Sequence, residues 1–308
     1  MKNYTIVFFV VISVAAWAQQ KTVQERLGYS KDTKLLIVHA DDLGVSHSEN
    51  VASIYAMEKG VVNSASIMVP CPWFSEIAAY AKAHPNACLG LHLTLNSEWK
   101  VYKWRPVAPH DEVSSLLDEN GYLNETVEAF LKNAKLEEVE KELRSQIERA
   151  KQFGIDPTHL DAHMGAAFAT AKFLEVLIKL GHEYKIPVMI SKDFSRVLNI
   201  DYTPFVTEKD VIVDRVIIAS GRDYKTGMEN FYEQQLKSLQ PGLNVLLLHA
   251  AYDNDEMKAV TVEHEDYGAA WRQLDFNFFT SEKCKKLIAE EKIKLVTWKE
   301  IRDKIVRK

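Results

Sequence analysis

Residues 35–44 read Leu-Leu-Ile-Val-His-Ala-Asp-Asp-Leu-Gly. The apolar run has the length of a buried strand. It delivers two adjacent carboxylates, Asp41 and Asp42, to its end before the chain turns at Gly44. We therefore expect residues 34–40 to form the first strand of a sheet and to place both carboxylates where that strand ends.

Two further stretches carry histidines in the same kind of setting. Residues 88–95 form a second apolar strand pattern that contains His92, and residues 158–163 end in His163. Together with Asp42, these two histidines make a candidate metal site. Two imidazoles and one carboxylate leave coordination positions open for water, as catalytic metal sites require.

Strand and helix patterns alternate about seven times along the chain, which indicates a parallel sheet. The expected strands are residues 34–40, 61–69, 88–95, 186–191, 211–219, 242–249 and 293–298. The expected helices include residues 46–59, 73–83, 136–153, 168–184, 228–239, 269–275 and 281–291. The predicted fold class is α/β, a single-domain distorted (β/α) barrel with about seven mostly parallel strands. The candidate polar residues follow strands, where barrel enzymes build their sites.

The N-terminus resembles a secretory signal peptide over residues 1–18, with Lys2, an apolar core and the cleavage pattern Ala16-Trp17-Ala18. A membrane anchor is the alternative, but the apolar run is shorter than the roughly 20 residues that span a bilayer. We expect a polar leader over residues 19–33, one domain over residues 34–308 and no membrane span after cleavage. The predicted location is periplasmic or secreted.

Charge and cysteine content exclude some partners. The net charge is −5 and the 38 basic residues are scattered, so nothing indicates binding to nucleic acid or to an anionic membrane. Cys71, Cys88 and Cys284 lack the spacing of a metal knuckle or a disulfide framework. We expect small core residues, with one disulfide of an exported protein as the alternative.

Residues 96–123 show no clear period and are rich in aromatic side chains. A loop of this length is usually functional or disordered. Trp104 and Arg105 favour a lid that faces a sugar substrate, because sugar faces stack on aromatic rings. The alternative is a lid that only packs on the core.

Other residues have both a catalytic and a structural interpretation. His249 closes an apolar strand and could protonate a leaving amine. Asp161, between His159 and His163, could orient an imidazole through its second nitrogen. Taken singly, His92 could be a core histidine and the aspartate pair a turn cap. Weaker candidates are His39, Asp253, His264 and Asp266.

Three motifs carry a family resemblance: Ala40-Asp41-Asp42-Leu43-Gly44, Gly90-Leu91-His92-Leu93-Thr94-Leu95 and His159-Leu160-Asp161-Ala162-His163. Together they resemble the YdjC family of carbohydrate deacetylases (the ChbG/HpnK-like group). Residues 62–68 resemble the family's second strand, and His249 with Tyr252 resembles its C-terminal segment. The resemblance covers residues 34–302.

The resemblance implies a distorted β/α barrel that removes N-linked acetyl groups from amino sugars with one divalent metal ion. It places the metal ligands on Asp42, His92 and His163, the general base on Asp41 and the acid on His249. His159 and Tyr252 then line the site or its second layer, and a homodimer is compatible with the resemblance.

The chain departs from the family pattern at three places. Leu43 stands where an aromatic residue is usual, Ala250-Ala251 replaces Pro-Gly, and residues 164–167 replace further histidines. These departures alter the wall that faces the substrate and leave the metal ligands unchanged.

The sequence therefore predicts a metal-dependent N-deacetylase for an acetylated amino sugar or short oligosaccharide. Two nitrogens and one carboxylate suit Zn²⁺, whereas the family resemblance implies Mg²⁺, for which imidazole is a poor ligand. A metal-dependent carbohydrate esterase and a noncatalytic exported sugar-binding protein remain alternatives.

Overall fold

β1 (Lys34–Leu43) is the central strand of the sheet, and every residue after Lys34 is buried. It runs parallel to β2 (Ser64–Ile67), β8 (Gly242–Leu248) and β9 (Lys294–Leu295). This computed structural model describes residues 21–308, so the predicted signal peptide lies outside the described residues. Within residues 21–308 no helix combines the length and the apolar character that a membrane crossing demands.

The main sheet has seven strands in the order β4-β3-β2-β1-β8-β7, with β9 also beside β1. The remaining strands are β3 (Leu89–Leu93), β4 (Leu160–Ala162), β5 (Ile190–Ser191), β6 (Ile212–Val213) and β7 (Arg215–Ile217). β5 and β6 form a second small sheet, and a parallel bridge from Leu160 to Val188 leads from β4 toward it. All these strand pairs are parallel.

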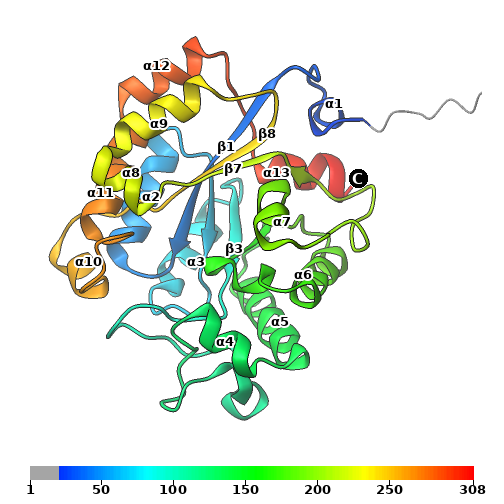
Figure 1. Ribbon diagram of the computed structural model, residues 1–308, viewed down its shortest axis with the longest axis vertical. Coiled ribbons are helices and arrows are strands. Elements are labelled where there is room, and N and C mark those ends of the chain that lie inside the picture. Colours follow the sequence, from blue (N-terminus) through cyan, green and yellow to red (C-terminus); the bar gives the residue numbers. More distant parts are fainter. Residues whose placement is uncertain (1–20) are drawn as a thin grey trace, which may run out of the picture.

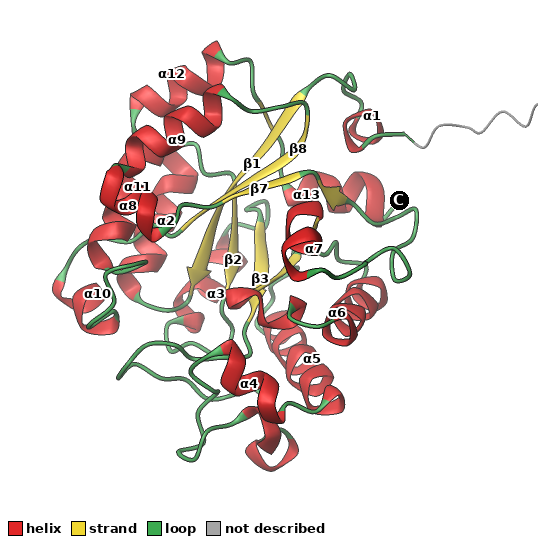
Figure 2. Cartoon of the chain, in the orientation of Figure 1, coloured by secondary structure: helices red, strands yellow, loops and turns green. Residues whose placement is uncertain are grey.

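The strands lie at the centre of the molecule and the helices surround them (Figures 1 and 2). The helices are α1 (Val23–Leu27), α2 (His47–Lys59), α3 (Phe74–Ala83), α4 (Val127–Asn133), α5 (Leu136–Gln152), α6 (Ala171–Tyr184), α7 (Lys192–Leu198), α8 (Gly221–Thr226), α9 (Met228–Lys237), α10 (Asp255–Val260), α11 (Ala269–Thr280), α12 (Glu282–Glu290) and α13 (Trp298–Ile301). The predicted α/β fold is confirmed: the parallel sheet curls into a half-barrel within a single domain.

Local signals explain the first helix after β1. The Ser46 side chain accepts a hydrogen bond from the Glu49 amide and so caps α2. At the other end, the Gly60 amide bonds to the Ala56 carbonyl and the helix ends, as the sequence predicts. α2 therefore begins immediately after the turn that carries Asp42.

The predicted strand over residues 211–219 is wrong as a single element. It divides into β6 and β7 at Asp214, whose carboxylate accepts from the Leu243 amide at 2.9 Å. β6 pairs with β5, whereas β7 pairs with β8, so the chain changes partner at this residue. The expected strand over residues 61–69 also shortens to β2, and the leader contains α1, which has a Thr22–Glu25 capping box.

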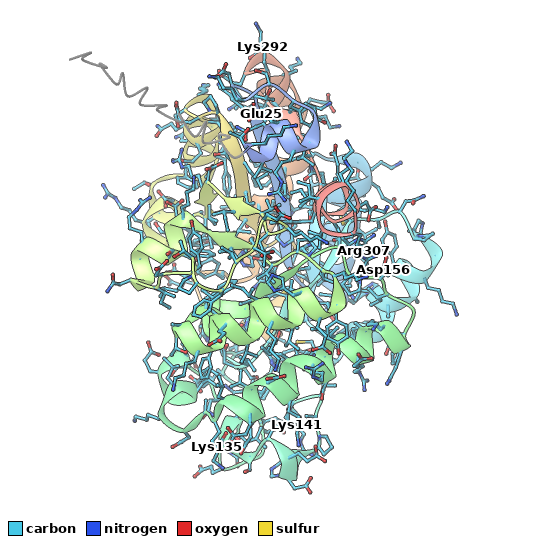
Figure 3. The ribbon with its side chains drawn as sticks, turned by 90° about the vertical axis from the view of Figure 1, so that its right-hand side faces the viewer. Glu25, Lys135, Lys141, Asp156, Lys292 and Arg307 are labelled. Carbon is cyan, nitrogen blue, oxygen red and sulfur yellow. The ribbon has the colours of Figure 1, made fainter. Side chains whose placement is uncertain are left out.

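The C-terminal segment fixes the approach to β4. Asp156 and Arg307, which lie side by side in Figure 3, are joined by two hydrogen bonds of 2.9 and 2.8 Å. Arg302 also donates to the Asp156 and Pro157 carbonyls, both at 2.9 Å. The turn that leads into the third motif is therefore held by the end of the chain.

The three cysteines are buried and free of disulfides, as expected for small core residues.

Candidate functional site

The end of β1 positions both aspartates. Asp42 has a φ of 67°, a left-handed conformation that is uncommon outside glycine but tolerated by aspartate. Gly44 follows with a φ of 101°, and the Val45 amide closes the turn on the Asp42 carbonyl at 3.1 Å. Since successive side chains of a strand alternate, this turn is what lets Asp41 and Asp42 both reach the interior.

Asp42, His92 and His163 meet at the carboxyl ends of three strands. Asp42 Oδ1 lies 3.5 Å from His92 Nε2 and 3.4 Å from His163 Nδ1. The three ligand atoms lie within 4.8 Å of one another, and all three residues are buried. The site predicted for a metal ion is thus brought together from β1, β3 and the segment after β4.

The donor atoms fit one divalent cation. Asp42 Oδ1 is buried and lacks a hydrogen-bond partner among the described residues. An unpaired buried carboxylate oxygen is costly, and a cation between it and the two imidazoles removes that cost. Ligands held at about 2.0–2.1 Å in a tetrahedron lie roughly 3.4 Å apart, which matches both separations. Two nitrogens and one oxygen suit Zn²⁺ or a similar transition metal better than Mg²⁺.

Each imidazole is also held by a second carboxylate. His92 Nδ1 lies 2.7 Å from Asp161 Oδ1, and His163 Nε2 lies 2.8 Å from Glu98 Oε2. The predicted position of Asp161 behind an imidazole is observed. Glu98 was missed, because no periodic pattern connects residue 98 with residue 163.

Arg272 of α11 holds the other oxygen of Asp42. Its Nη2 donates to Asp42 Oδ2 at 2.8 Å, and its Nη1 donates to Glu49 Oε2 at 2.7 Å. Burial raises the pKa of Asp42, but the charge of Arg272 and the nearby His163 ring outweigh it and hold that pKa well below its usual range. Burial raises the pKa of Glu49 to about 8. Glu49 and Arg272 were also missed, since in sequence they are an ordinary first-turn acid and a helix cation.

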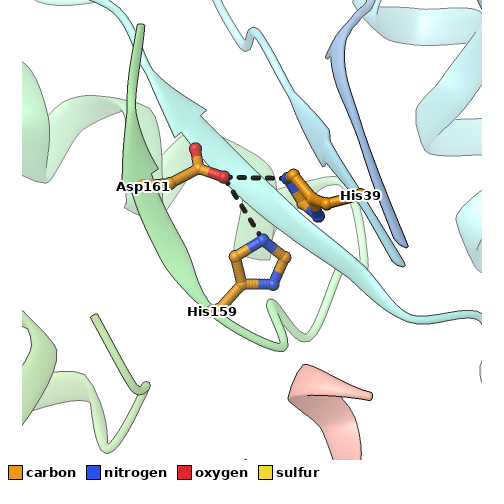
Figure 4. Close-up of side chains that lie close together, drawn as sticks. All are labelled: His39, His159 and Asp161. Carbon is orange, nitrogen blue, oxygen red and sulfur yellow. Dashed lines mark hydrogen bonds and ion pairs between the residues drawn. The ribbon is translucent and has the colours of Figure 1, made fainter. Parts of the chain in front are cut away.

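His39, His159 and Asp161 form a buried polar cluster (Figure 4), which contacts the ligand His92 through Asp161. His39 Nε2 lies 2.9 Å from Asp41 Oδ1 and 3.0 Å from Asp161 Oδ2. Burial lowers the pKa of His39, but the negative charges of these two aspartates raise it to about 10. His39 is therefore positively charged at neutral pH and ties the two carboxylates together.

His159 is the member of this cluster that packs against Trp298. Its ring stacks on Trp298 with centroids 5.3 Å apart, and its Nε2 lies 3.3 Å from Asp161 Oδ2. Burial lowers the pKa of His159 to about 4, so the ring is neutral. A Cβ atom on Gly90 would lie 2.3 Å from the His159 ring, which shows how closely β3 passes over it.

His249 stands on the same edge of the sheet, at the end of β8. Its amide donates to Asp275 Oδ2 at 2.9 Å. Its side chain is half-buried, and its ring centroid lies 5.2 Å from that of Tyr267. Burial lowers the pKa of His249 to about 4. At neutral pH the imidazole is uncharged and can accept a proton.

The remaining candidates differ in their exposure. Trp104 is buried, donates to the Asn96 carbonyl at 3.0 Å and lies 6.1 Å from the His163 ring. Arg105 is exposed and covers Tyr122, while Tyr252 packs on Phe276. Their substrate roles stay predictions.

Two loops meet beside Arg272, the residue that holds Asp42. The ring centroid of Trp99 lies 4.9 Å from that of His264 and 5.5 Å from the central carbon of the Arg272 guanidinium. Lys100 pairs with Glu263 in the same place. The segment after β3 is therefore joined to the segment after β8 next to Arg272.

The family model described as YdjC-like protein matches residues 35–290. The chain belongs to the YdjC-like family. The family match contains all three metal-ligand candidates, Asp41 and His249. The resemblance seen in the three motifs is confirmed.

Three known proteins are similar to this chain over part or most of its length. A carbohydrate deacetylase of Thermus thermophilus is 32% identical over 285 residues, 91% of this chain and 97% of that protein. A chitooligosaccharide deacetylase of Serratia marcescens is 35% identical over 133 residues, 42% of this chain and 49% of that protein. The crystal structure of an Enterococcus faecalis protein, whose name refers to cellobiose-phosphate cleavage, superposes with a TM-score of 0.73 at 24% identity. It covers 87% of this chain and 99% of its own, so the fold is shared over nearly its whole length.

Proposed function

We propose that this protein is a metal-dependent carbohydrate deacetylase that hydrolyses N-acetyl groups of an amino sugar or short oligosaccharide. The observation that carries the proposal is the unpaired buried Oδ1 of Asp42, 3.5 and 3.4 Å from His92 Nε2 and His163 Nδ1. The names of the Thermus and Serratia relatives support carbohydrate deacetylation as the reaction.

Three residues of the chain hold the metal ion, and a fourth holds one of them in place. When bound, a divalent ion supplies polarisation of the acetyl carbonyl and acidification of the attacking water. Asp42, His92 and His163 hold that ion, and Arg272 keeps Asp42 ionised and oriented. Zn²⁺ or a similar transition metal is the ion that the donor set favours.

Asp41 is the proposed general base. Its Oδ1 accepts a hydrogen bond from Ser66 Oγ at 3.0 Å and forms an ion pair with His39, and no hydrogen bond among residues 21–308 reaches Oδ2. Burial raises the pKa of Asp41, but the charges of His92 and His39 lower it overall. Asp41 is therefore ionised at neutral pH, with one oxygen fixed and the other available to take the proton of water.

His249 is the proposed proton donor to the leaving amine. It is neutral before reaction and takes from solvent the proton that it gives to the amine, while Asp41 returns the proton of the attacking water to solvent. Burial and the charge of Arg272 lower its pKa, and the charges of Asp42 and Asp41 offset only part of that effect, so a ring that has gained a proton gives it up readily to the amine. Breaking the C–N bond then yields acetate and the free amine.

We propose an exported location, periplasmic or secreted, on the basis of the signal-like pattern in residues 1–18.

Acetate release tests the proposal. Zn²⁺-loaded protein is incubated with N-acetylglucosamine, with its β-1,4-linked dimer and trimer, and with an O-acetylated sugar. We expect acetate from an N-acetylated substrate and none from the Asp42→Ala variant. Acetate from the O-acetylated sugar alone would identify an esterase, and saturable sugar binding without any acetate would identify a binding protein.

A further inference from the structure

Glu98 contacts the ring nitrogen of His163 that faces away from Asp42. Glu98 Oε2 lies 2.8 Å from His163 Nε2, while His163 Nδ1 lies 3.4 Å from Asp42 Oδ1. The Glu98 side chain is 14% exposed, so its carboxyl group is largely buried. Of the two ring nitrogens, Nδ1 is thus turned to the ligand cluster and Nε2 to the carboxylate.

His92 shows the same arrangement with the roles of its two ring nitrogens exchanged. Its Nε2 faces Asp42 Oδ1 at 3.5 Å, and its Nδ1 lies 2.7 Å from Asp161 Oδ1. A carboxylate that accepts the N–H of a metal-binding imidazole fixes the tautomer and orients the ring. Asp161 belongs to the third motif, whereas Glu98 comes from the segment that follows β3.

The segment that carries Glu98 is itself held in place. The Ser97 amide donates to the Asn124 carbonyl at 2.8 Å, and Ser97 Oγ accepts from the Trp104 amide at 3.1 Å. Trp104 Nε1 donates to the Asn96 carbonyl at 3.0 Å. Glu98 therefore follows two residues that are anchored to Trp104 and Asn124, which allows it to set the position of the His163 ring.

We propose that Glu98 is a positioning residue that holds the proton of His163 on Nε2 and leaves Nδ1 free to bind the metal ion. The inference rests on the proposed metal-dependent function. It also gives residues 96–104 a role that does not depend on the predicted contact with substrate: their folding completes the metal site.

Zinc affinity is the first test, measured by chelator competition on the full chain. We expect Glu98→Ala to weaken Zn²⁺ binding by about 10 to 100-fold, the usual cost of losing such a partner. Glu98→Gln, which keeps an acceptor for Nε2–H, should recover much of that loss. Glu125→Gln is the matched control, since Glu125 lies on the same segment, is exposed and pairs with Lys103.

Selective ¹⁵N labelling of the histidines is the second test and does not depend on activity. In the Zn²⁺-loaded parent, long-range ¹H–¹⁵N spectra should show His163 with a protonated Nε2 and a metal-bound Nδ1; the His163→Gln variant identifies its signals. A metal-bound Nε2 would overturn the proposal. So would unchanged Zn²⁺ affinity in Glu98→Ala, or a loss as large as in Asp42→Ala, which would make Glu98 a ligand.

The outcomes separate this inference from the proposed function. If the parent binds Zn²⁺ and releases acetate while Glu98→Ala behaves as the parent, only the role of Glu98 fails. If the parent binds no Zn²⁺, the metal-dependent function fails and the role of Glu98 fails with it.

Discussion

Arg272 Nη2 donates to Asp42 Oδ2 at 2.8 Å, and this single contact decides which oxygen of Asp42 faces the two histidines. The guanidinium is buried, bonded also to Glu49 and covered by Trp99. Because Oδ2 is occupied by Arg272, Oδ1 remains for a cation. A residue of α11, far along the chain from the three motifs, thus completes the first motif.

Replacing Arg272 by leucine should destabilise the protein strongly. The buried Asp42 carboxylate would lose its counter-charge and the buried Glu49 side chain would lose its hydrogen-bond donor, and breaking a buried ion pair costs about 3–5 kcal/mol. Urea denaturation of the metal-free chain measures the free energy of unfolding. Arg272→Leu combined with Glu49→Leu should recover part of the loss, because one buried polar group without a partner is then removed. A change of less than about 1 kcal/mol in the single variant would contradict the prediction.

Asp41→Asn should abolish catalysis while leaving metal binding intact. The asparagine carbonyl can still accept from Ser66, but the side chain can no longer take a proton from water. We expect kcat to fall by about 10²–10⁴-fold, the usual contribution of a general base. Elemental mass spectrometry of the same preparation should show an unchanged metal content. Near-normal turnover with metal bound would refute the assignment of the base.

Gly90→Ala should destabilise the fold through His159. The added methyl would lie 2.3 Å from that ring, and overpacking of a core costs about 1–3 kcal/mol. A double-mutant cycle with His159→Ala checks the cause, since the cost of the methyl should largely disappear when the ring is absent. Equal costs in both backgrounds would place the strain elsewhere.

Glu142 of α5 should make stability depend on pH. Its carboxylate accepts from the Val107 and Ala108 amides at 2.9 and 2.8 Å, and burial raises its pKa to about 7 from a usual 4.5. The folded protein thus holds this proton more tightly than the unfolded chain. Its stabilising contribution is complete below pH 4.5 and is lost as the pH rises through 7, by roughly 3 kcal/mol for a shift of this size.

The matched variant for this test is Glu142→Gln, which cannot titrate. Free energies of unfolding at pH 4.5, 6 and 7.5 should fall less steeply with pH in the variant than in the parent. Parallel curves would show that Glu142 does not carry the dependence.

Much of the fold and the centre of the site could be predicted because both depend on local patterns. The apolar run of β1 and the strand around His92 are visible as strands, and parallel strands bring their carboxyl ends to one edge. The three motifs therefore had to meet. The division of residues 211–219 could not be predicted, since a β-branched run does not show which neighbour each half pairs with.

The residues that contact the metal ligands could not be predicted from the sequence, for a different reason. Glu49 and Arg272 occupy ordinary helix positions, and Glu98 follows β3 in a stretch without periodicity. Their importance comes from tertiary contacts with Asp42 and His163 that no spacing encodes.

The pairing of β1 has a consequence for the order of folding. Leu36 pairs with Asn244 of β8 on one side and with Leu295 of β9 on the other. Both partners come from the last quarter of the chain, so the first strand cannot complete its edges there until synthesis is almost finished. Such long-range pairings form slowly, and an unpaired strand edge is a site of aggregation. A chain that stops before residue 294 would expose the start of β1, and the protein therefore depends on its final residues to protect its first strand.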